Sequence, residues 1–301
     1  MPLRVTNSNL TTILSTRIGA NRQRLEVVQE RISTGKRINR PSDDPFGTEA
    51  VLRYRTLQNA VEHYQENAAT VKDNLLITDG IMESYEQLVD RASVLISQGV
   101  TDTASAPARE AIARELDGIR SQMIAIANKK SGDSFLFGGT RQDVAPFDAD
   151  GNPAAGAVSP QLVQVEPDAA PIVAGITGEQ IFTNSTTSVF TTLEDAANAL
   201  RGTGDPVADK ATALSAIDSL QSFSVQAETG RSQVGASLNA IENAGERLSS
   251  QSLAFQESID RFETADIAAL AIELSQAGTA LQATIQASAF TGKGSLMDLI
   301  G

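Results

Sequence analysis

The sequence predicts a mainly α-helical protein: a long antiparallel coiled-coil or helical-bundle rod formed by both chain ends, with a small β-rich insert domain at its tip. Three observations predict this fold class. Apolar residues recur at alternating spacings of four and three over most of the chain, as they do in coiled-coil seams. They are mostly Ala, Leu, Ile and Val, with 10 Phe, 3 Tyr and no Trp, which suits helices packed along seams. Between residues 132 and 182 the spacing gives way to turn-forming residues.

Each end of the chain carries one short seam. The first stops at Gly35, a residue type that suits the left-handed position just past a helix end. We expect the two terminal helices to lie antiparallel and to order fully only against neighbouring copies, because such a pair leaves its apolar stripe partly uncovered. The predicted assembly seam consists of Leu14, Ile18, Leu25, Val28, Ile32, Ile267, Leu270, Leu274 and Leu281, with Asn21 as its one polar member in the first helix.

Long helices are predicted between these ends. The 4-3 alternation continues without a slip from Ala50 to Ile96, so a helix from Pro45 to Gln98 would be roughly 80 Å long. A second helix with the same apolar spacing should follow and pack antiparallel against it. A later long helix, which leads back toward the chain ends, should end near Phe262. The next seam residue lies five positions on, at Ile267, so a bend or an insertion is needed there.

These breaks divide the chain into three predicted domains. Residues 1–35 and 265–301 form the terminal helical pair, an inner core that orders on assembly. Residues 36–140 and 191–264 form the helical rod domain. Residues 141–190 form the small β-rich insert domain, where the run Leu162 to Val165 and the turn Asp150-Gly151 are β-prone.

The stretch "ISTGKRINRPSDDPFG", residues 32–47, is predicted to be a joint between two helices. Asp44 suits the N-cap position and Pro45 the first helical position of the long helix. Basic residues lie within a few positions of Asp43 and Asp44, so a local salt-bridged loop is expected, with modest energies if it is exposed. The joint loop residues are Gly35, Arg37, Arg40, Pro41, Asp43, Asp44 and Pro45.

Composition excludes several classes of function. The formal net charge of -13 repels nucleic acid and anionic membrane surfaces. There is no cysteine, which removes disulfides, thiolate nucleophiles and Cys-based metal sites. No apolar run approaches the roughly 20 residues that span a bilayer. We therefore expect neither nucleic-acid binding nor membrane insertion.

No catalytic, cofactor-binding or metal-binding residues are predicted, and we expect no enzyme. The single histidine, His63, lies mid-helix without a second His or any Cys, so a His-based triad and a zinc motif both fail. The Gly-Lys pairs at 35–36 and 292–293 lack the glycine of a phosphate loop. "DADGNP" begins like a calcium loop, but Pro153 replaces its glycine, and a hairpin turn explains it better.

Several motifs resemble the flagellin superfamily and, within it, the flagellar hook-associated protein 3 family. They are "ISTGKRINRPSDDPFGTEAVLRYRTL" (32–57), "ANKKSGDSFLFGGT" (127–140), "GITGEQIF" (175–182) and the final stretch 263–300. Within the superfamily, the sequence resembles the hook-associated protein 3 family more than the filament flagellins at Lys36, Arg40-Pro41, Pro45 and "FLFGGT". The terminus "SLMDLI" resembles the termini of both families, so it does not distinguish between them.

The resemblance implies a structural role at the junction between the hook and the filament of a bacterial flagellum. The implied partners are further copies in a ring-like layer, the hook-side junction protein, flagellin, and a cytoplasmic export chaperone at the carboxyl-terminal segment. Export through the flagellar type III channel, without a cleaved signal peptide, would place the protein outside the cell.

Two alternatives remain open at this point. The chain could be a short flagellin that polymerises as the filament itself, although the loop prolines argue against this. It could also be a secreted enzyme with the insert as its catalytic domain. The stretch 132–182 contains no His, Cys or Lys, so the site checklist gives this reading little support.

Overall fold

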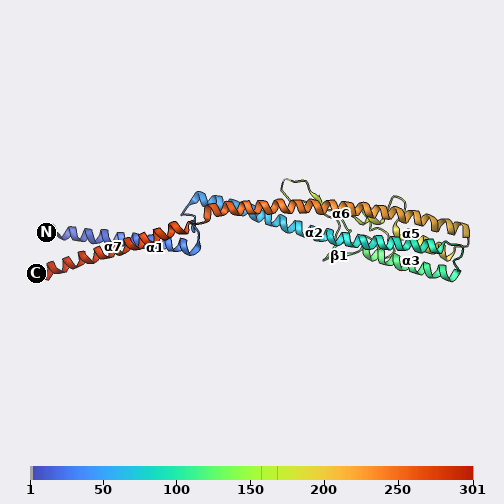
Figure 1. The fold of residues 1–301 in the computed structure, drawn as a ribbon, viewed down its shortest axis with the longest axis horizontal. Helices are drawn as coiled ribbons and strands as arrows, with labels where there is room; N and C mark the ends of the chain where they lie inside the picture. The colour runs from blue at the N-terminus through green and yellow to red at the C-terminus, as the bar shows by residue number, and fades with distance from the viewer. Residues whose placement is uncertain (1–2, 157, 168, 301) are drawn as a thin grey trace. The chain divides into compact units, whose positions relative to one another are not determined.

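The computed structural model describes residues 3–156, 158–167 and 169–300. Side chains are described for residue 9 and for residues 12–289, with the same internal gaps. The described residues form seven helices and two two-stranded antiparallel sheets (Figure 1). In chain order these are α1 (Leu3–Thr34), α2 (Pro45–Gly99), α3 (Ala106–Ala127), β1 (Lys130–Ser131), β2 (Ser134–Phe135), β3 (Leu162–Val163), β4 (Ile172–Val173), α4 (Gly178–Phe182), α5 (Val189–Arg201), α6 (Pro206–Glu263) and α7 (Ile267–Ile300).

The chain divides into two compact units, which are described separately below. The terminal unit contains residues 1–60 and 251–301, and the central unit contains residues 61–250. The terminal unit therefore includes α1, α7, the start of α2 and the end of α6. The central unit includes the remaining helices and all four strands.

In the terminal unit, α1 and α7 lie side by side and antiparallel (Figure 1). Val28, Ala265 and Leu270 form the buried core of this pair. Polar contacts continue along it toward the chain ends. The side-chain amide of Asn21 donates to the hydroxyl of Thr284 at 2.8 Å, and Arg24 pairs with Glu273 at 3.1 Å.

The same unit holds the first turns of α2 against the last turns of α6. The Tyr54 ring lies 6.1 Å from the Phe255 ring and 6.4 Å from the Phe262 ring, centroid to centroid. The side-chain amide of Gln58 donates to Gln256 nearby. These aromatic contacts join the start of α2 to the end of α6.

In the central unit, the later turns of α2 pack with α3, α5 and α6 around one apolar core (Figure 1). Helix α3 begins at Ser105, whose hydroxyl accepts from the backbone N–H of Ala108, the usual N-cap interaction. Arg231 of α6 pairs with Asp79 and Glu86 of α2 at 3.0 and 2.9 Å. Core residues without exposed surface include Met82, Tyr85, Leu116, Met123, Leu193, Leu220 and Phe223.

An aromatic cluster anchors the insert to this helical core. Phe182 of α4 is fully buried, and its ring contacts Tyr85, Phe137, Phe147 and Phe190 at centroid distances of 4.9 to 5.9 Å. Three of these four rings meet Phe182 edge to face, a favoured geometry for aromatic pairs. The motifs "FLFGGT" and "GITGEQIF" each supply one of these phenylalanines, so both motifs serve packing.

The predicted fold class is confirmed: the chain is mainly helical, with paired ends and a small β-containing region. The predicted helix from Pro45 to Gln98 is one residue shorter than α2. The strands are only two residues long, and of the two sheets only β3 with β4 lies within 141–190. Loops make up most of that segment, since five prolines interrupt the run from 146 to 171 and proline cannot donate to a strand ladder.

Candidate functional site

Residues 35–45, which connect α1 to α2 and include the first residue of α2, pair with residues 262–266, which include the end of α6 and its connection to α7. We call this region the joint. Gly35 takes a left-handed conformation with φ of 69°, which ends α1 at little conformational cost. Its carbonyl accepts from the N–H of Ala265 at 3.0 Å, and the N–H of Arg37 donates to the carbonyl of Glu263 at 2.7 Å. Two short segments far apart in sequence thus form an isolated antiparallel β-bridge.

Glu263 is the central charge of the joint. Its carboxylate pairs with Lys36 at 2.7 Å and with Arg55 at 2.8 Å, while only 14% of its side chain is exposed. Burial by itself raises the pKa of Glu263, but the hydrogen bonds and charges of Lys36 and Arg55 outweigh it and hold the pKa below its usual value. The carboxylate therefore stays ionised and ties the loop, α2 and the end of α6 together.

Two aspartates shape the loop itself. Oδ2 of Asp43 accepts from the backbone N–H groups of Arg40 and Asn39 at 2.9 and 3.1 Å, which lowers the pKa of Asp43. Oδ1 of Asp44 accepts from the N–H of Gly47 at 2.9 Å, the N-cap interaction of α2. That backbone hydrogen bond, with help from Arg37, lowers the pKa of Asp44.

Two arginines connect the loop to both helical partners. Arg37 donates to Oδ2 of Asp44 at 3.0 Å and to the carbonyl of Phe262 at 2.9 Å. Arg40 pairs with Glu30 in the last turns of α1 at 3.2 Å. Pro41, the residue after Arg40, is exposed. Because these side chains are largely exposed, each pair contributes under about 1 kcal/mol, and together they define the loop's geometry.

Gly47 allows the loop to pack closely on α2. A Cβ atom at this position would lie 2.6 Å from Oδ2 of Asp44 and 2.6 Å from Cδ1 of Ile38. Ile38, an aliphatic side chain of the loop, is buried. A larger residue at position 47 would have to displace the side chains of Asp44 and Ile38.

The predicted seam residues differ in how far a single chain covers them. Val28 and Leu270 are buried, while Leu14, Ile18, Leu25, Ile32, Leu274 and Leu281 are half-buried. Ile267 is exposed over 51% of its surface, and Ala265 takes the buried place beside Val28 instead. The role of these side chains between copies stays a prediction.

The other residues that the sequence suggested as candidates for catalysis or metal binding have structural surroundings that support neither role. His63 is exposed and lies 3.5 Å from Glu66, one turn away. Asp148 accepts from the backbone N–H groups of Asp150 and Asn152, so it organises a turn. Within the described residues, no cluster of three or more His, Asp or Glu could hold a metal. No described helix combines the length and apolarity needed to cross a membrane.

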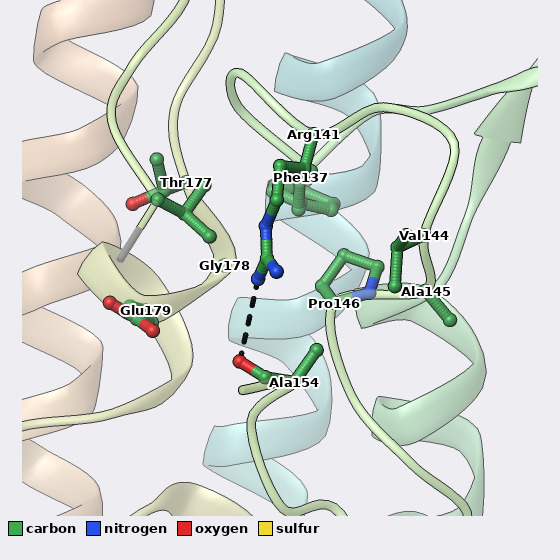
Figure 2. Close-up of a pocket in the computed structure, with 11 residues that line it drawn as sticks. Phe137, Arg141, Val144, Ala145, Pro146, Ala154, Thr177, Gly178 and Glu179 are labelled. Carbon is green, nitrogen blue, oxygen red and sulfur yellow. Dashed lines mark hydrogen bonds between the residues drawn. The ribbon is translucent and has the colours of Figure 1, made fainter. Parts of the chain in front are cut away.

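A small cavity in the insert is filled by an arginine (Figure 2). It measures about 20 Å³ and is lined by residues such as Phe137, Pro146 and Thr177, which leaves room for roughly one water molecule. The guanidinium of Arg141 reaches across it to the carbonyls of Ala155 at 2.6 Å and of Gly156 at 3.2 Å. These hydrogen bonds hold the two ends of the loop from residue 141 to residue 156 together. The arginine side chain leaves no space in the cavity for an organic ligand.

Replacing Arg141 with alanine should loosen this loop. We expect the free energy of unfolding of the central unit to fall by about 1 to 2 kcal/mol, because charge-assisted hydrogen bonds to backbone carbonyls are lost. Urea denaturation followed by far-UV circular dichroism measures it. Arg109→Ala is the matched control, since Arg109 is exposed on α3. Equal midpoints for the two variants would contradict this role for Arg141.

The joint should loosen in acid. Asp43, Asp44 and Glu263 all have pKa values below their ordinary values of 3.8, 3.8 and 4.5. Their contribution is therefore fully present above those ordinary values and is lost as the pH falls through the lowered ones. NMR shifts of the Arg37 and Ala265 amides should stay constant from about pH 7 to about pH 4.5 and change below that. A transition of these amides near neutral pH would contradict the assignment.

Sequence reasoning identified the loop but missed its partners across the joint. The five-residue step from Phe262 to Ile267 located the second break, yet it did not show that Glu263 faces the loop. Arg55 looked like an ordinary helix-surface residue. The two carboxylates inside the predicted break, Glu263 and Asp266, opposite a loop with three basic residues, were the available signal.

Known proteins match this chain in sequence and in fold. Residues 5–141 match the family described as the bacterial flagellin N-terminal helical region. Flagellar hook-associated protein 3 of Escherichia coli strain K12 is 27% identical over 279 residues, covering 86% of this chain and 87% of that protein. The Salmonella typhimurium LT2 protein of the same name is 34% identical over 163 residues, covering 53% of this chain and 50% of that protein.

A solved structure supports the fold. The crystal structure of flagellar hook associated protein-3 from Legionella pneumophila aligns with a TM-score of 0.62 at 14% identity, covering 70% of this chain and 98% of that chain. At this identity the alignment shows a common fold alone. The sequence matches confirm the predicted resemblance and the prediction of a structural protein that is not an enzyme.

Proposed function

Because the chain is a flagellin-like structural protein that resembles flagellar hook-associated protein 3, we propose that it is an adaptor subunit at the junction between the hook and the filament of a bacterial flagellum. Copies assemble side by side into a ring-like layer through the terminal unit. The joint fixes the geometry of the α1 and α7 pair relative to the first turns of α2. The central unit carries the insert.

One observation supports assembly through the terminal unit above the others. Among the described residues, the pair of α1 and α7 buries few apolar side chains: Val28, Ala265 and Leu270 close to the joint, and Ala277 farther along α7. Farther toward the ends, Leu14, Ile18 and Leu25 stay half-buried in the single chain. Two helices alone cannot cover a seam on all sides, so neighbouring copies supply the remaining surface.

The distribution of charge is consistent with this. Residues 61–250 contain 12 basic and 26 acidic residues, whereas residues 1–60 and 251–301 together contain 12 basic and 11 acidic residues. Copies packed through a nearly neutral unit avoid the repulsion that strongly acidic surfaces would produce at short range. The acidic unit is better suited to face solvent.

The proposed partners follow from the resemblance. The layer of copies contacts the hook-side junction protein on one side and flagellin on the other. A cytoplasmic export chaperone binds the carboxyl-terminal segment before secretion. The chain then reaches the extracellular flagellum through the type III export channel without a cleaved signal peptide.

Electron microscopy of flagella tests this function. A strain of the native bacterium that lacks the protein should make hooks without filaments and release flagellin into the medium. The full-length chain should restore filaments, and a chain lacking residues 264–301 should not. Normal filaments in the deletion strain would overturn the proposal. The number of copies per flagellum distinguishes this proposal from the alternative that the chain is a filament flagellin. A closed layer needs on the order of ten copies, whereas an open filament needs thousands.

A further inference from the structure

Phe46 is an exposed aromatic side chain at the joint. It lies in the first turn of α2, and 85% of its surface is accessible. Aromatic side chains contribute large apolar area and are enriched where proteins contact partners. No side chain that the structure describes in the terminal unit covers this ring, although in sequence it lies next to Pro45 and Gly47, which the joint holds in place.

A pocket of about 130 Å³ lies between the joint loop and α2. Its apolar lining comes from Ile38 and Pro41 of the loop and from Val51 and Leu52 of the helix. Ile38 and Val51 are buried, whereas Leu52 is exposed over 57% of its surface. The lining also includes Arg40, Arg55 and Glu263, whose carboxylate pairs with Arg55. The pocket is thus partly apolar, partly charged and open on one side.

Phe46 and the pocket lie on opposite sides of the same helix. An α-helix turns by about 100° per residue. The α2 residues that line the pocket are Thr48, Val51, Leu52 and Arg55, and their directions cluster roughly 180° from that of Phe46. A chain therefore cannot place its own Phe46 ring in its own pocket.

The pocket suits a phenyl ring in size and in charge. A cavity of about 150 Å³ in another protein accommodates benzene, close to the volume found here. Arginine side chains favour contact with an aromatic face, which Arg40 and Arg55 offer. Glu49, one turn after Phe46, is exposed. In a second copy it would approach the exposed guanidinium of Arg40 at the rim, beside the pair that Arg40 forms with Glu30 of its own chain, so the contact would bring opposite charges together.

We propose that Phe46 of one copy inserts into the 38–55 pocket of a second copy of this chain. The contact joins two different surfaces, so each copy offers one ring and one pocket to its neighbours. Such head-to-tail contacts generate closed rings or open helices rather than isolated pairs. This inference rests on the proposed function and names the contact that would position neighbouring joints in the layer.

Cysteine cross-linking in assembled flagella tests the contact, because the chain has no cysteine of its own. Full-length protein carrying Glu49→Cys next to the ring and Pro41→Cys at the pocket, with Phe46 retained, is expressed in the native bacterium, and purified flagella are treated with a short bis-maleimide. We expect a ladder of cross-linked dimers, trimers and larger species. Leu57→Cys with Pro41→Cys is the matched control, since Leu57 is also exposed on α2 but lies about three helical turns beyond Phe46; it should yield no ladder.

A second variant tests the energetic role of the ring. Phe46→Ala should reduce the fraction of hooks that bear filaments at least about tenfold, as expected for an interface anchor. Leu57→Ala should leave that fraction unchanged. Absence of the wild-type chain from purified flagella would overturn the proposed function and this inference with it. If the chain is present and supports filaments, a missing ladder or full filament attachment by Phe46→Ala overturns the Phe46 contact alone.

Discussion

Replacing Phe182 with alanine is expected to lower the free energy of unfolding of the central unit by about 4 kcal/mol. The Phe182 ring is fully buried and contacts four other aromatic rings, with Tyr85 closest at 4.9 Å between centroids. Rings from α2, the loop before the insert, the insert and α5 surround it, so the cavity left by alanine cannot close by moving one element. Urea denaturation, followed by the near-UV circular dichroism of Tyr85, measures the change.

The matched control for this variant is Leu76→Ala. Leu76 lies on α2 in the same unit but is exposed over 51% of its surface, so its loss should cost less than about 1 kcal/mol. Phe182→Leu fills part of the cavity and should fall between the two. A Phe182→Ala variant as stable as Leu76→Ala would show that the aromatic cluster does not hold the insert on the helices.

The helices could be predicted from sequence because their energetics are local and periodic. A seam repeated from Ala50 to Ile96 allows a single continuous helix, and α2 extends from Pro45 to Gly99. The break after Thr34 was equally visible, since glycine is the residue that takes φ of 69° at low cost. Patterns of this kind need no knowledge of distant contacts.

The insert and the far side of the joint could not be predicted in the same way. The Phe182 cluster joins rings from residues 85 to 190, and no spacing rule links such distant positions. Likewise, Glu263 and Arg55 are 208 residues apart in sequence, so their pairing depends on how α2 and α6 meet. Sequence reasoning located the two breaks and left their mutual contact undetermined.

Glu263→Gln is expected to destabilise the terminal unit by about 2 kcal/mol, because it removes the charge between Lys36 and Arg55. The carboxylate is only 14% exposed, while both cationic partners are 46% exposed, so solvent screening keeps the loss below that of a fully buried pair. Hydrogen exchange at the Arg37 and Ala265 amides measures it, since both donate across the joint. Their protection should fall more than that of amides in the middle of α2.

Glu257→Gln is the control, because Glu257 is exposed on α6 six residues before Glu263 and also carries one negative charge. If the two variants lose protection equally, then only the net charge of α6 matters. If Glu263→Gln alone loosens the two amides, the carboxylate itself fixes the loop against the end of α6. Since the joint determines where α1 ends and α7 starts, the same variant should then attach fewer filaments than Glu257→Gln in the native bacterium.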